Sequence, residues 1–167
     1  MKLFIASLLV FSLVILFLFA LFPTDITVSR VVQINRSSAE VLRKIDDLRE
    51  WKSWNELLVN GLDNMKKVNA PVKIDSSHIQ KGFFMIDLLK VVPDTVTTVW
   101  HQEEKSFTGN YFLSGADQQT VVEWTLQFHI HWYPWDKLAS MFYDKNLGPG
   151  MEKSLMNLKN ELESPVH

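Results

Sequence analysis

The pattern of apolar and polar positions divides the chain into a uniformly apolar N-terminal stretch and a longer part in which the two kinds alternate. Residues 3–22 contain only two polar side chains, Ser7 and Ser12. At about 1.5 Å per residue, such a stretch forms a helix of about 30 Å, which matches the hydrocarbon core of a bilayer. The pattern predicts a transmembrane anchor over residues 1–23, followed by one domain over residues 24–167.

A cleaved signal peptide and a buried helix are the two alternatives for this stretch. It is longer than the usual apolar region of a signal peptide, about 7–15 residues, and it lacks a small-x-small cleavage site. Lys2 is the only charged side chain before it, and Asp25 is the first one after it. The positive-inside rule therefore predicts a single-pass protein with a cytoplasmic N-terminus and an extracytoplasmic, periplasmic domain.

The domain begins with a strand and a helix. Residues 24–34 alternate with a period of two, and Arg30 shares a face with Ile26 and Val28, which predicts a strand. Ser37 followed by Glu40 forms a capping-box pattern, which predicts the start of a helix ending near residue 47.

The middle of the chain combines one more short helix with a series of strands. Residues 51–58 predict the helix, and residues 61–69 predict a loop. The alternation along residues 120–132 is the clearest strand signal, with Trp124 and Phe128 on one face. The other predicted strands are residues 72–80, 82–92, 95–101 and 107–114.

The C-terminal part has a helical period. Residues 135–147 predict one helix, and the Gly-Pro-Gly sequence of residues 148–150 predicts an interruption. An apolar stripe then predicts a second helix, formed by Met151, Leu155, Leu158 and Leu162. The predicted fold class is α+β, with a curved antiparallel sheet wrapped around a long C-terminal helix.

Composition excludes several classes of protein. Of the 167 residues, 47% are hydrophobic and 22% are charged, so the chain can bury a core and is not disordered. It has no cysteine, which excludes disulfides, thiol catalysis and Cys-ligated metals. The net charge of −2 gives no bulk attraction to nucleic acid, so no nucleic-acid partner is expected.

Six blocks of sequence resemble the SRPBCC superfamily, also called START-like or helix-grip. Residues 28–35 with 39–41 look like its opening strand and helix, and residues 47–54 match its D-x-x-x-W-x-x-W stretch. Residues 120–126 resemble its last strand. Residues 141–149 and 158–162 resemble the closing helix of the polyketide cyclase/dehydrase-like branch. Bacterial members with one N-terminal span are similar to the chain as a whole.

The resemblance implies a mostly apolar cavity between the sheet and the last helix, which in members of the superfamily holds lipids or other hydrophobic molecules. It implies no shared catalytic motif, so no catalytic residue, cofactor or metal is assigned. The candidates for lining such a cavity are Arg30, Trp54, Phe84, Trp100, Phe112, Trp124, Phe128 and Met151.

Two further motifs have competing interpretations. His129 and His131 stand two apart on one predicted strand, a spacing that can hold a metal, but a solvated strand face is the favoured interpretation. Residues 132–135, Trp-Tyr-Pro-Trp, favour a core corner, with an anchor at the membrane interface as the alternative.

The function predicted from the sequence is membrane-tethered binding of a hydrophobic small molecule or lipid. A polyketide cyclase-like or hydrolase enzyme is one alternative, with Arg30 as the first charged residue to examine. An envelope module that binds another protein is the other alternative, and no such partner is identified.

Overall fold

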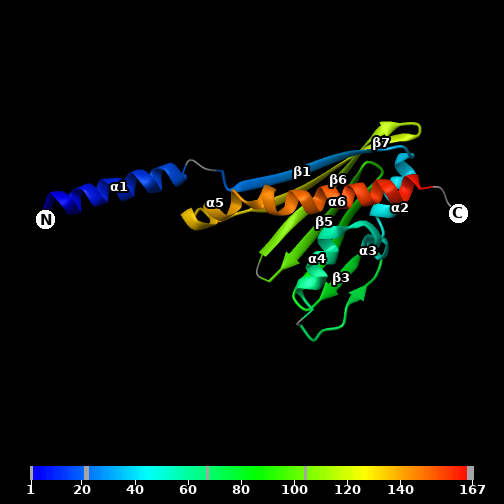
Figure 1. Ribbon diagram of the computed structural model, residues 1–167, viewed down its shortest axis with the longest axis horizontal. Helices are drawn as coiled ribbons and strands as arrows, with labels where there is room; N and C mark the ends of the chain where they lie inside the picture. The colour runs from blue at the N-terminus through cyan, green and yellow to red at the C-terminus, as the bar shows by residue number, and fades with distance from the viewer. Residues whose placement is uncertain (1, 21–22, 67, 104, 165–167) are drawn as a thin grey trace.

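The computed structural model describes residues 2–20, 23–66, 68–103 and 105–164 (Figure 1). The helices, including one short 3₁₀ helix η1, are α1 (Lys2–Ala20), α2 (Ser38–Ile45), η1 (Leu48–Glu50), α3 (Trp51–Trp54), α4 (Glu56–Asn64), α5 (Pro134–Ser140) and α6 (Tyr143–Glu163). The strands are β1 (Asp25–Ile34), β2 (Lys73–Ile74), β3 (His78–Lys81), β4 (Phe84–Val92), β5 (Thr95–Gln102), β6 (Lys105–Ala116) and β7 (Gln119–His129).

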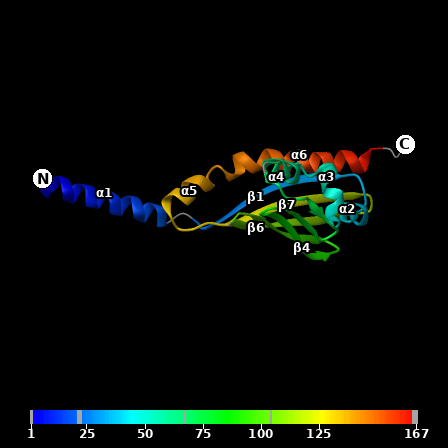
Figure 2. The ribbon, with the colours of Figure 1, turned by 90° about the horizontal axis from the view of Figure 1, so that it is seen from below.

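The strands form one antiparallel sheet in the order β1-β7-β6-β5-β4-β3-β2. Consecutive strands from β2 to β7 are neighbours, and β1 forms the other edge of the sheet by pairing with β7. The helices α2, α3, α4 and α6 cover one face of this sheet, and α6 lies lengthwise over it (Figure 2). The predicted α+β class, with a curved sheet and a long C-terminal helix, is therefore confirmed.

The hydrophobic core lies between the sheet and α6, because both elements present apolar side chains to the same space. On β7, Val122, Trp124 and Leu126 are buried, and they belong to one face of the strand as the alternation predicted. Met151 and Leu155 from α6 are buried in the same cluster. Burial of these two stripes against each other holds the helix on the sheet.

The helices before the sheet begin at polar caps. Glu40 accepts hydrogen bonds from the backbone N–H and the hydroxyl of Ser37, so the predicted capping box is present. Asn55 ends α3 and caps α4 by accepting a hydrogen bond from the backbone N–H of Leu58. The single predicted helix over residues 51–58 is therefore two helices. The second runs on to Asn64, where a loop was predicted, because Leu58 and Leu62 bury one face of it.

The predicted interruption at residues 148–150 is wrong, because α6 continues through Pro149 to Glu163. The two flanking glycines lie against other elements and leave no space for a side chain. A Cβ at Gly148 would lie 2.0 Å from an Arg30 nitrogen, and one at Gly150 would lie 2.4 Å from Leu57. The Gly-Pro-Gly sequence therefore marks close packing of α6 rather than its end.

The strand predicted over residues 120–132 is shorter than expected at its C-terminal end. β7 ends at His129, and the backbone N–H of Ile130 donates to the carbonyl oxygen of Thr24. α5 then begins at Pro134. In the first turn of a helix the backbone N–H has no partner within the helix, so the missing N–H of proline costs nothing. The helix predicted over residues 135–147 is divided between α5 and α6.

The N-terminal helix α1 extends away from the sheet and lies beside α5 at the end nearest the domain (Figures 1 and 2). Its large apolar side chains from Phe4 to Phe17 are exposed, except that of Ile15, which is partly buried. Within the described residues, no helix is long and apolar enough to cross a membrane. The transmembrane helix predicted over residues 3–22 is therefore not confirmed, and its last two residues, Leu21 and Phe22, lie outside the described residues.

Candidate functional site

Five large aromatic side chains occupy the space between the sheet and the helices. They are Trp51, Trp54, Trp100, Tyr111 and Trp124, and all are buried. The ring of Tyr111 stacks on Trp124 at 5.0 Å between centroids and meets Trp51 edge-on at 5.5 Å. Trp51 and Trp54 lie 5.3 Å apart. These contacts make one continuous cluster, which we call the aromatic interior.

The aromatic interior continues as a row of rings toward the end of the sheet nearest α5. Trp100 stacks on Phe107 at 5.8 Å, and Phe107 lies 4.6 Å from Phe128. Phe128 meets Tyr143 at 4.9 Å, at the first residue of α6. Phe107, Phe128 and Tyr143 are only partly buried, so the row runs from the core to the surface.

The indole N–H groups of the interior differ in their hydrogen bonding. Trp51 donates to the carbonyl oxygen of Ile45 at 2.9 Å, and Trp100 donates to the hydroxyl of Thr98 at 3.1 Å. The Nε1 atoms of Trp54 and Trp124 have no hydrogen-bond partner among the described residues. A buried donor without an acceptor costs about 1–3 kcal/mol, so an acceptor placed here would stabilise the interior.

Gly109 allows the Trp100 arrangement. Thr98 donates its hydroxyl to the carbonyl oxygen of Gly109 at 3.1 Å and accepts from Trp100. A Cβ at position 109 would lie 2.7 Å from the Thr98 hydroxyl oxygen and 3.1 Å from the Trp100 indole nitrogen. Any side chain here would therefore displace the Thr98 hydroxyl, which accepts the indole N–H of Trp100.

Tyr111 is the ionisable side chain at the centre of the aromatic interior. Its hydroxyl oxygen accepts a hydrogen bond from the Asn55 side-chain amide at 3.3 Å. Burial raises the pKa of Tyr111 well above its ordinary value, because the phenolate would be removed from water. The phenol therefore stays protonated at neutral pH and offers the interior a polar group without a charge.

Arg30 lies at the edge of the interior, between β1 and α6. Its guanidinium donates to Asp144 at 2.9 Å and to the Ser29 carbonyl oxygen at 2.7 Å. The side chain lies against Gly148, which has no Cβ to exclude it. Arg30 of β1 is therefore joined to α6 by its ion pair with Asp144, whose side chain is largely exposed.

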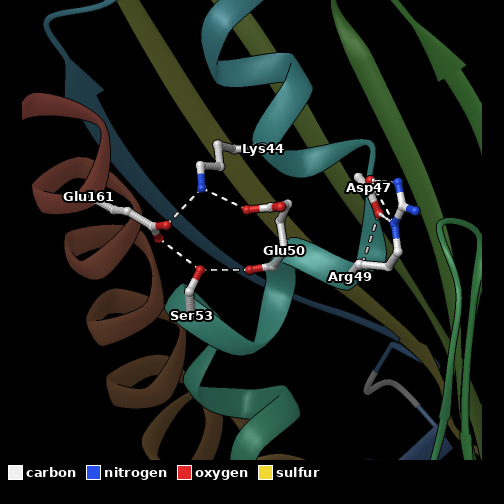
Figure 3. Close-up of polar contacts among 6 residues, drawn as sticks. All are labelled: Lys44, Asp47, Arg49, Glu50, Ser53 and Glu161. Atoms are coloured by element: carbon white, nitrogen blue, oxygen red, sulfur yellow. Dashed lines mark hydrogen bonds and ion pairs between the residues drawn. The ribbon is translucent and has the colours of Figure 1, made fainter. Parts of the chain in front are cut away.

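A second, polar site lies at the opposite end of α6. A pocket of about 750 Å³ opens to solvent there, and three basic and four acidic side chains line it. Lys44 donates to Glu50 at 2.8 Å and to Glu161 at 2.7 Å, and the Ser53 hydroxyl donates to Glu161 at 2.9 Å (Figure 3). These bonds join α2 and α3 to α6.

Lys44 forms ion pairs with Glu50 and Glu161, so part of the charge of this pocket is already paired. Burial alone would lower the pKa of Lys44, but the hydrogen bonds to Glu161 and Glu50 outweigh it and raise the pKa above its ordinary value. The hydrogen bond from Arg49 lowers the pKa of Asp47 (Figure 3). A nearly balanced set of charges has little preference for a charged ligand, and the hydrogen bonds of Lys44 and Ser53 join neighbouring helices, so we interpret this pocket as a structural junction.

Seven of the eight candidates for lining a cavity lie on the helix-covered face of the sheet or on the helices that cover it. Arg30 is at its edge and Phe128 is partly buried; the five buried ones are Trp54, Phe84, Trp100, Trp124 and Met151. Phe112 is different: it is 41% exposed on the opposite face. Its buried neighbours Tyr111 and Leu113 alternate with it along β6, so the strand period turns its ring outward.

Tyr111 and Asn55 were missed as candidates. The alternation along β6, which buries residues 111 and 113, was the available signal for Tyr111. Asn55 gave no such signal, because its role as a cap inside a buried helix junction depends on the break between α3 and α4.

The two histidines considered as metal ligands contact different carboxylates. His129 pairs with Asp25 at 2.8 Å, whereas His131 lies beyond the end of β7 and pairs with Asp136 at 3.3 Å. Within the described ranges, no group of three or more His, Asp or Glu side chains is placed to hold a metal ion. The two histidines are therefore surface residues with separate carboxylate partners.

A single sheet gripping a long C-terminal helix around an apolar interior defines the helix-grip class. The family model for "Polyketide cyclase / dehydrase and lipid transport" matches residues 25–163, and the chain belongs to this family. Among curated proteins, none matches the chain in sequence.

Solved structures share the fold at low sequence identity. A protein from Thermobifida fusca is 14% identical with a TM-score of 0.57, over 84% of this chain and 97% of that one. CalU16 from Micromonospora echinospora is 14% identical with a TM-score of 0.53, over 85% of each chain. DynU16, from the dynemicin biosynthetic locus, is 17% identical with a TM-score of 0.53, over 83% of this chain and 47% of that one. The chain thus spans about half the length of DynU16.

Proposed function

We propose that the protein binds a hydrophobic molecule carrying a hydrogen-bond acceptor in the aromatic interior beneath α6. The observation that carries the proposal is the pair of buried indole N–H groups, on Trp54 and Trp124, that lack an acceptor. Both rings contact Tyr111, so the two donors belong to one cluster. An oxygen of the bound molecule would satisfy them while its apolar part replaced ring–ring contacts.

The row of rings from Trp100 to Tyr143 supports a route into this interior. Its outer members are partly buried and come from different elements, β6, β7 and α6. A bound acyl or polycyclic group would enter between them by moving the start of α6. The family description names lipid transport among its activities, which agrees with a ligand of this kind.

Native mass spectrometry of the full chain, freed of lipid in detergent and then mixed with oleate, tests the proposal. We expect a bound oleate adduct, weakened several-fold in Trp124→Phe, which keeps an aromatic ring but removes the indole donor. Phe112→Leu is the matched control, because Phe112 lies on the exposed face of the sheet and its loss should leave the adduct unchanged. Equal weakening in both variants, or no adduct in the wild type, would contradict the proposal.

We further propose that the N-terminal stretch tethers this binding domain to a membrane as a single-pass anchor. The support is the apolar surface of α1, together with residues 21 and 22, which complete twenty residues with only Ser7 and Ser12 polar. With Lys2 on the short flank, the domain would lie on the extracytoplasmic side. A tether keeps the interior close to the place where hydrophobic molecules concentrate.

Protease treatment of intact spheroplasts tests the tether and its orientation. The expected result is digestion of the domain with a short fragment left in the membrane. Protection of the domain would reverse the orientation, and recovery of the whole chain in the soluble fraction would contradict the tether.

A further inference from the structure

The segment from Trp132 to Phe142 presents apolar side chains to solvent. Trp132 is 62% exposed and Trp135 is 66% exposed, which excludes the core corner that the sequence allowed. We call the exposed set the α5 patch, and its members are Trp132, Tyr133, Trp135, Leu138, Met141 and Phe142.

The amphipathic character of α5 is inverted. Its buried residues are Lys137, only 4% exposed, and Ser140, whereas Trp135 and Leu138 face outward. A helix on the surface of a water-soluble domain normally places its apolar side chains inward and its polar ones outward. The inversion leaves the outward face of α5 apolar.

The composition of the patch favours the interfacial zone of a bilayer. The rings of Tyr133 and Trp135 stack at 5.1 Å, and Trp132 lies 5.1 Å from Tyr133, so three aromatic side chains form one surface. Trp and Tyr are enriched at the depth of lipid headgroups, because each combines an apolar ring with a polar atom.

The patch also lies beside α1. The two helices are in contact, and both figures show α5 beside the domain end of α1 (Figures 1 and 2). Only residues 21–24 join α1 to β1, and five residue steps reach at most about 18 Å. If α1 enters a bilayer, α5 is therefore held at its surface.

We propose that the α5 patch docks onto a phospholipid bilayer and fixes the orientation of the domain there. The inference rests on the proposed tether by α1. Tyr143, the outer end of the row of rings, directly follows Phe142 of the patch. Docking would therefore turn this end of the domain toward the lipid. The patch would thereby place the entrance of the proposed binding site against the membrane.

Fluorophores attached to single cysteines in the full chain test this docking, because the chain has no cysteine of its own. The labelled variants are Leu138→Cys and Met141→Cys, in vesicles of phosphatidylethanolamine and phosphatidylglycerol. Leu89→Cys is the control, since Leu89 is 63% exposed on β4, on the far side of the sheet order from α1 and β1.

The expected result is blue-shifted emission at positions 138 and 141, with quenching by headgroup spin-labelled lipid several-fold stronger than at position 89. Equal accessibility of all three labels to aqueous iodide would overturn the docking while leaving the tether intact, provided that the chain floats with the vesicles. If the chain does not float with the vesicles, both the tether and the docking are contradicted. The proposed binding of oleate, which is measured in detergent, would still stand. Labels hidden from iodide but unquenched by lipid would assign the patch to a protein contact instead.

Discussion

The buried tryptophans of the interior differ in whether the indole N–H has an acceptor. This difference separates a structural role from the proposed binding role. Trp51 donates to Ile45, whose carbonyl belongs to the last turn of α2 and has no partner within that helix. Trp54 and Trp124 donate to nothing among the described residues. The three side chains are equally buried, so substitution by phenylalanine removes the same volume from each.

We expect Trp51→Phe to lower the free energy of unfolding by about 1–3 kcal/mol more than Trp54→Phe or Trp124→Phe. Only the first change leaves a buried carbonyl without its donor. Urea unfolding of the lipid-free full chain, followed by circular dichroism, measures the difference. Equal losses in the three variants would mean that the indoles of Trp54 and Trp124 have partners in solution.

The raised pKa of Tyr111 predicts a loss of stability in alkali. In the unfolded chain the phenol ionises near its ordinary value of 10.0, whereas burial keeps it protonated in the folded chain. Above that pH the unfolded state releases a proton that the folded state retains, so the free energy of unfolding falls, by up to about 1.4 kcal/mol per pH unit. Unfolding of wild type and Tyr111→Phe between pH 8 and pH 11 measures it. Parallel curves would show that Tyr111 ionises normally.

At the scale of elements, α4 and α6 approach their neighbours through glycines. Gly61 of α4 faces the ring of Phe84 on β4, and Gly148 of α6 faces Arg30 on β1. The sequence alone predicted loops or breaks at these positions, because glycine usually interrupts a helix. The close approach of another element is a long-range fact that the local pattern does not contain.

Gly61→Ala tests this packing. Alanine favours a helix over glycine by about 0.5–1 kcal/mol, but its Cβ would lie 2.6 Å from the nearest carbon of the Phe84 ring. We expect overpacking to dominate and to lower the free energy of unfolding by about 1–3 kcal/mol. Asn60→Ala, one residue earlier on the exposed side of α4, is the control and should change it by less than about 0.5 kcal/mol. A more stable Gly61→Ala would show that Phe84 moves freely.

Features set by the local sequence were more predictable than features set by packing between distant elements. The alternation along β7 and the capping box at Ser37 are local signals, and both were correct where they apply. The continuation of α6 through Pro149 and the outward ring of Phe112 were not predicted. The first depends on packing against β1, and the second depends on the register of a strand whose pattern is weaker than that of β7.

At the scale of the whole molecule, two apolar surfaces remain uncovered by the domain. One is α1 and the other is the α5 patch, and they lie at the same end as the outer rings of the aromatic row. The sequence predicted the apolar stretch of α1, but its preference for a core corner at residues 132–135 was wrong, because Trp132 and Trp135 are exposed. The proposed membrane contact and the proposed ligand entry both lie at this end, and the charged junction around Lys44 lies at the other.

The central claim is that a hydrophobic molecule occupies the aromatic interior, and nitrogen-15 NMR of the six tryptophan indoles tests it most directly. The full chain is placed in phosphatidylcholine nanodiscs and titrated with oleate, and each signal is assigned by its loss in a Trp→Phe variant. The account predicts that the indole N–H signals of Trp54 and Trp124 shift, while that of Trp51, already bonded to Ile45, stays close to its position. Shifts confined to Trp132 and Trp135, or no shift at all, would contradict it.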